Sequence, residues 1–113
     1  MSQSVEEVAE LQKYLQGVLN RADHHADNVN EVILTLTGAI IWRKDPESIR
    51  VYTQKGKTGN VLWVHIGGKK YAFSYDHVNG TIEMRADGIQ GSVVRTFSNA
   101  DTAASVKQFF ANL

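Results

Sequence analysis

The sequence has no cysteine, a single proline and no net charge, with 12 basic and 12 acidic residues among 113. Without cysteine, the chain can form neither disulfide bonds nor thiolate metal sites. A neutral chain is a poor general binder of polyanions, because affinity for phosphate backbones depends mainly on surplus lysine and arginine. The longest apolar runs, such as Val32–Leu34 and Ala39–Trp42, are far shorter than the roughly 20 residues that cross a bilayer. The composition therefore disfavours nucleic acid as a partner and excludes a membrane span.

The first residues, Met1–Glu7, lack both the basic start and the unbroken apolar stretch of a secretory signal. We therefore expect a soluble, cytoplasmic protein. The length suits one domain, since a chain of this size buries roughly two-thirds of its unfolded surface without needing disulfides or metals. We expect residues 1–113 to form that single domain, and no motif in them calls for a cofactor.

Two segments have the periodicity of helices. In the first, apolar residues recur at steps of three and four from a capping box at Ser4 and Glu7 to about Ala26. The members of this stripe are Val5, Val8, Leu11, Leu15, Val18, Leu19 and Ala22. A second helix follows a cap at Ser98 or Asn99 near the end of the chain. Its apolar stripe consists of Val106, Phe109, Phe110 and Leu113.

The region between these helices is typical of antiparallel strands. From Glu31 to Arg43, apolar and polar residues alternate and β-branched residues are frequent, which predicts a strand with a bulge or bend at Gly38. Further alternating segments follow at 49–54, 61–66, 69–75, 81–85 and 92–97. We therefore predict about six strands in a meander, either open or strongly curved.

Two glycine-containing turns set the pairing of the central strands. Gly67-Gly68 and Asn79-Gly80 are both favoured in two-residue hairpins. Counting outward from each turn pairs the residues on its two sides. Across the second turn, this count places Tyr75 opposite Met84. Both counts place the same apolar set on one face: Leu62, Val64, Ile66, Tyr71, Phe73, Tyr75, Ile82 and Met84. We predict an α+β fold in which the N-terminal and C-terminal helices cover this face.

The motifs that could carry chemistry are incomplete. Gly56-Lys57-Thr58 ends like a phosphate-binding loop but lacks the earlier glycine and the helix that should follow. Residues 23–27 (DHHAD) place at most two metal-competent side chains on one helix face. Ser74, Asp76 and His77 are close in sequence, but their side chains point to both faces of a strand. We therefore predict neither a catalytic nor a metal site, and enzymatic activity is unsupported.

The presence of aromatic residues on the opposite, nominally polar face of the sheet requires an explanation. The register places Trp63 and His65 on that face with Glu83 and Arg85, and Tyr52 joins them from the neighbouring strand. These five are the candidate ligand or interface residues. A curved sheet would bury the rings, a homodimer packed sheet to sheet would cover them, and a small-molecule pocket would use them as walls.

We predict a small non-enzymatic binding protein that self-associates as a homodimer through this aromatic-bearing face. The first alternative is a small-molecule-binding protein or an enzyme with a pocket around Trp63 and His65. The second alternative is a module for single-stranded nucleic acid, with bases stacked on Trp63 and Tyr52 and phosphates near Lys57, Lys69 and Lys70. Basic side chains fall at both ends of the sheet among acidic ones, so no continuous basic track supports this second alternative.

Overall fold

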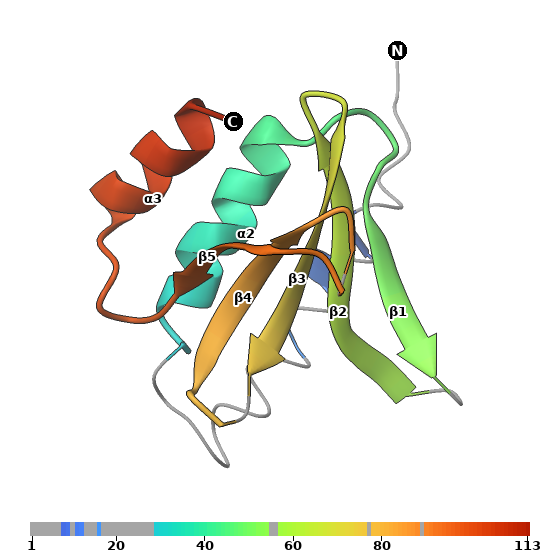
Figure 1. Ribbon diagram of the computed structural model, residues 1–113, viewed down its shortest axis with the longest axis horizontal. Coiled ribbons are helices and arrows are strands. Elements are labelled where there is room, and N and C mark those ends of the chain that lie inside the picture. The colour runs from blue at the N-terminus through green and yellow to red at the C-terminus, as the bar shows by residue number, and fades with distance from the viewer. Residues whose placement is uncertain are drawn as a thin grey trace.

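The computed structural model describes residues 8, 9, 11, 12, 16, 29–54, 57–76, 78–88 and 90–113. Residues 8, 9, 11, 12 and 16 are helical, as predicted for the N-terminal segment. The other positions of the helix predicted over 4–26, including its capping box, lie outside the described residues. The elements that follow are α2 (Val32–Arg43), β1 (Arg50–Gln54), β2 (Lys57–Ile66), β3 (Lys69–Asp76), β4 (Thr81–Ala86), β5 (Val93–Phe97) and α3 (Ala103–Ala111) (Figure 1).

The described strands form one open antiparallel sheet. Each strand pairs with the next in sequence, so the predicted meander is confirmed, with five strands in place of about six. The strand order β1-β2-β3-β4-β5 leaves β1 and β5 as edges. Figure 1 shows α2 and α3 on the same side of the sheet. This arrangement confirms the predicted α+β class, in which helices cover one face of an antiparallel sheet.

The core lies between the helices and the inner face of the sheet. Leu11 of the N-terminal helix joins the buried side chains of α2, α3 and the strands in one apolar cluster. Phe73 from β3 and Phe110 from α3 are fully buried and stacked, with ring centroids 6.4 Å apart. Burial of each such side chain stabilises the fold by about 1.5–3 kcal/mol. The predicted apolar face is the buried one, since none of its members exceeds 7 % exposure: Leu62, Val64, Ile66, Tyr71, Phe73, Tyr75, Ile82 and Met84.

Residues 32–43, which we predicted to be most of a strand, form the helix α2. The prediction is wrong because the segment also repeats apolar residues with a helical period, and burial against the sheet decides between the two conformations. The hydroxyl of Thr37 donates to the carbonyl of Ile33 at 2.6 Å, which satisfies a β-branched polar residue inside the helix. The buried side of α2 consists of Val32, Ile33, Leu36, Ala39 and Ile40.

The start of α2 is capped from the far end of the chain. The Oδ1 atom of Asn99 accepts hydrogen bonds from the backbone N–H groups of Glu31 and Val32 at 3.0 and 2.9 Å. The prediction that Ser98 or Asn99 caps the last helix is wrong, because the side chain of Thr102 caps α3. Asn99 instead satisfies backbone donors that the start of α2 would leave open, and so ties the C-terminal segment to this helix.

The first hairpin has the predicted register. Ile66 pairs with Lys69 around the two-residue turn Gly67-Gly68. The φ angles of these glycines are 60° and 81°, the left-handed values that this type of turn requires and that favour glycine.

The second hairpin is longer than predicted. Tyr75 pairs with Ile82 instead of Met84, because the strands end at Asp76 and the loop contains four residues. The carboxylate of Asp76 accepts from the side-chain Nδ2 of Asn79 at 2.7 Å and from its backbone N–H at 3.4 Å, and such aspartate-capped turns compete with the two-residue type. The register differs by two residues, an even number, so every side chain keeps the face that we predicted for it.

Replacing Asn99 with alanine should lower the free energy of unfolding by about 1 kcal/mol, the usual cost of removing a helix cap. Urea unfolding followed by circular dichroism measures this change. Asn112→Ala is the control, since the Asn112 side chain donates to the carbonyl of Gln108 at the exposed end of α3, and we expect a much smaller loss. An Asn99→Ala protein as stable as the parent would contradict the capping role.

Candidate functional site

The outer face of the sheet, which points away from the helices, carries the side chains that we predicted to form a site. Arg50 pairs with Trp63, Trp63 with Ala72, and Ala72 with Arg85, so these residues form one row across four strands. Ala72 is 1 % exposed, as expected for a small residue between two much larger side chains. The backbones of Trp63 and Arg85 are separated by two strand spacings, about 10 Å.

Four of the five candidate residues share this outer face. His65 lies two residues after Trp63 in β2 and is exposed, and Glu83 lies two residues before Arg85 in β4. Tyr52 belongs to β1, but its side chain lies outside the described residues. The geometry therefore places Trp63, His65, Glu83 and Arg85 as predicted, and their role in binding stays a prediction.

Charged groups on the outer face contact their neighbours instead of converging on a common point. Arg85 bonds the carboxylate of Glu83 at 3.1 Å and donates to the carbonyl of Gly91 at 2.9 Å. The Nζ atom of Lys70 lies 5.2 Å from the centroid of the Trp63 ring, within the range of a cation–π contact. The Arg85–Glu83 pair is partly exposed and contributes about 0–1 kcal/mol. The outer face is a mixed polar surface on which Trp63 already contacts a cation.

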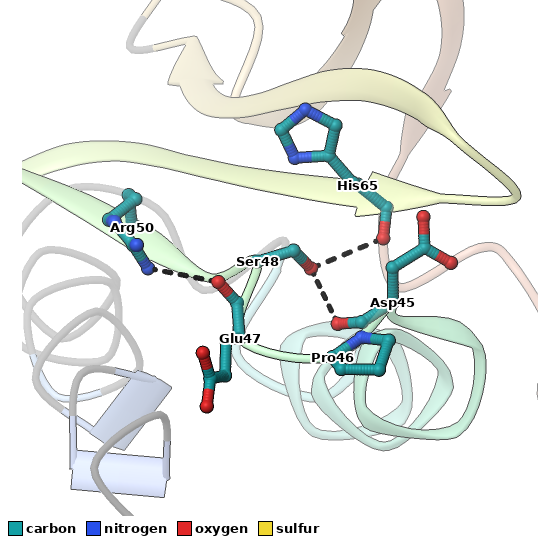
Figure 2. A pocket seen from close by; sticks show the side chains of 6 residues that line it. All are labelled: Asp45, Pro46, Glu47, Ser48, Arg50 and His65. Carbon is teal, nitrogen blue, oxygen red and sulfur yellow. Dashed lines mark hydrogen bonds between the residues drawn. The ribbon is translucent and has the colours of Figure 1, made fainter.

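A pocket of about 300 Å³ lies at the corner where β1 begins. Its lining consists of Asp45, Pro46, Glu47, Ser48, Arg50 and His65 (Figure 2). Figure 2 shows the imidazole of His65 pointing away from Ser48, and the carboxylates of Asp45 and Glu47 pointing away from each other. These titratable groups therefore do not gather around one position, as general acid–base catalysis requires.

The polar groups of this pocket hold the backbone together. The carboxylate of Asp45 accepts from the N–H groups of Gly67 and Gly68 at 3.2 and 2.8 Å, so it fixes the turn between β2 and β3. The hydroxyl of Ser48 contacts the carbonyls of Asp45 and His65 at 2.8 and 3.3 Å. A serine hydroxyl placed between two acceptors donates its proton to them and is not activated as a nucleophile. We conclude that the corner pocket is mainly structural.

Other chemistry that the sequence suggested is absent from the described residues or lies beyond them. Among the described residues, no group of three or more histidine, aspartate or glutamate side chains is arranged to hold a metal ion. Residues 23–27 and His77 lie outside the described part. No helix in the described part of the chain has the length and apolar content needed to span a membrane.

Helix α2 presents a second surface, which we call the outer face of α2 and which consists of Leu34, Gly38, Ile41 and Trp42. Leu34 is 58 % exposed, Ile41 45 % and Trp42 53 %. Their spacing places them on one side of the helix, opposite the buried residues. Surface helices usually carry polar residues on this side. Helix α2 is therefore apolar both where it meets the core and where it meets solvent.

Sequence analysis missed the outer face of α2 because it predicted a strand there. Alternation in a strand would separate Leu34 from Ile41 on opposite faces, whereas a helix brings them together. The signal that could have found it is length: the apolar segment forms 12 helical residues, and a strand typically has about 4–8.

Comparison with protein-family models places most of the chain in a known family. A family model described as "Integron cassette protein VCH_CASS1 chain" matches residues 11–107. The match includes α2 and all five described strands and ends within α3. A search of curated proteins finds no significant match.

If the corner pocket is structural, Asp45→Ala should destabilise the fold by about 1.5 kcal/mol, because two hydrogen bonds to a charged acceptor are lost. Thermal and urea unfolding measure the effect. Glu47→Ala is the matched control, since it removes a neighbouring carboxylate that points away from that of Asp45. Glu47 has a φ angle of 54°, and the replacement is again a residue other than glycine, so the backbone strain at this position stays the same. Equal losses of unfolding free energy for the two variants would show that the hydrogen bonds from the turn to Asp45 do not stabilise the fold specifically.

Proposed function

The chain belongs to the integron cassette protein family which that model describes, and we propose that it is a small non-enzymatic interaction protein that self-associates through the outer face of α2. The observation that carries this proposal is the exposure of three large apolar side chains on one side of one helix. Scattered apolar residues on a surface are ordinary, but a contiguous apolar helix face marks a contact site.

The outer face of the sheet supports self-association less well. Interface cores are depleted of charged residues, whereas Trp63 lies among Arg50, Lys70 and the Arg85–Glu83 pair. Packing the outer faces of two copies together would bury these charged side chains against the same side chains of the other copy. The homodimer that we predicted for this face therefore fits the outer face of α2 better.

The alternatives have weaker support from the geometry. A small-molecule site or active site near Trp63 and His65 would need convergent polar groups, and the adjoining pocket uses Asp45 and Ser48 to bind backbone. Single-stranded nucleic acid would need open aromatic rings along a basic track, but Lys70 already covers part of Trp63.

Self-association through one helix face should be reversible, because a contact of this kind is smaller than that of an obligate dimer. We expect the wild-type protein to have the mass of two chains at high micromolar concentration and to dissociate on dilution. Size-exclusion chromatography with light scattering measures the mass. Leu34→Glu and Ile41→Glu should each make the protein monomeric at the same concentration, since a buried unpaired carboxylate opposes association.

Val78→Glu is the matched control. Val78 is 92 % exposed in the loop after β3, so this variant adds the same charge to the surface outside α2 and should remain dimeric. Circular dichroism checks that all three variants are folded. A wild-type protein that stays monomeric at high micromolar concentration would overturn the proposal, and so would dimeric Leu34→Glu and Ile41→Glu variants.

A further inference from the structure

We infer that two copies of α2 cross antiparallel at Gly38, with the backbone of one copy packed on the backbone of the other. This inference rests on the self-association proposed above and specifies its geometry. It depends on three observations: the position of Gly38, the placement of apolar residues around it, and the charges at the two ends of the helix.

Gly38 has no role in packing within the part of the chain that the structure describes. It lies inside α2, where glycine is less favourable than alanine, and it is exposed. A Cβ atom added at this position would meet nothing within 4 Å, so no neighbour among the described residues requires the absence of a side chain. A residue that costs helix stability without an internal reason fits close approach by another backbone.

The apolar residues lie on both sides of Gly38 along the same helix face. Leu34 precedes it by four residues, and Ile41 and Trp42 follow by three and four. Helical spacing therefore puts Gly38 at the centre of the outer face, with a large side chain one turn away in each direction. An antiparallel crossing at Gly38 brings Leu34 against Trp42 of the partner subunit, and by symmetry the same contact forms twice.

The charges at the ends of α2 favour the antiparallel orientation. Glu31 stands at the start of the helix and Lys44 at its end, whereas the guanidinium of Arg43 is directed to the carbonyl of Leu113. Antiparallel copies bring the acidic end of one helix toward the basic end of the other, whereas parallel copies bring like charges together. The two helix macrodipoles also oppose each other in the antiparallel arrangement.

The absence of cysteine allows a direct test, because a single introduced thiol can form a disulfide only with a partner chain. The experiment mixes Leu34→Cys and Trp42→Cys proteins at high micromolar concentration under mild oxidation, and mass spectrometry identifies the cross-linked pairs. We expect mainly the mixed disulfide. Leu34 and its counterpart would be about 12 Å apart along the helix axis in this arrangement, beyond the Cα separation of about 7 Å that a disulfide allows.

A parallel crossing predicts the reverse result, with each variant cross-linking to itself. Val78→Cys gives the background of random collision. Preferential Leu34–Leu34 and Trp42–Trp42 products would overturn the antiparallel crossing, and so would mixed products no more abundant than the Val78→Cys background.

Gly38→Leu tests the close approach separately. The new side chain enters open space in the single chain, so the melting temperature at low micromolar concentration should be unchanged or higher. It should separate the crossing helices and weaken dimerisation at least tenfold, measured by sedimentation equilibrium. Gly38→Leu with unchanged dimerisation would overturn the crossing at Gly38 while the proposed function stands. A monomeric wild-type protein would overturn both.

Discussion

The packing of α2 against the inner face of the sheet is the contact on which the rest of the arrangement depends. The sheet is apolar on one face, and α2 covers that face beside α3. Both ends of α2 are tied to the C-terminal segment: Asn99 accepts from the backbone at its start, and Arg43 donates to the carbonyl of Leu113 at 2.8 Å. A helix fixed at both ends and buried along one side holds its opposite side in a defined position toward solvent.

The sheet could be predicted from the sequence because side chains in a strand alternate between two faces. Gly67-Gly68 fixed one register correctly, and at Asn79-Gly80 the register was displaced by an even number of residues. The apolar face survived this error because only an odd displacement moves side chains to the other face. The exact loop length could not be predicted, since it depends on how the carboxylate of Asp76 bonds within the turn.

Helix α2 could not be predicted from its local pattern. Residues 32–37 have both strand and helix periodicity, and the β-branched residues favoured the strand. What decides the conformation is distant in sequence: the apolar sheet face that α2 covers and the cap from Asn99. The candidate site residues likewise include some that the local pattern could place and some that it could not. Trp63, His65, Glu83 and Arg85 were placed on the correct face by alternation, whereas the outer face of α2 exists only if the segment is helical.

The cap from Asn99 also affects how the chain folds during synthesis. The two backbone donors that it satisfies lie 68 and 67 residues earlier in the chain. Translation adds Asn99 after all of α2, so the start of the helix has no such cap until residue 99 has been made. Contacts between such distant residues slow folding, since a long loop must close before they form. Until that loop has closed, the first backbone N–H groups of α2 can bond only to water.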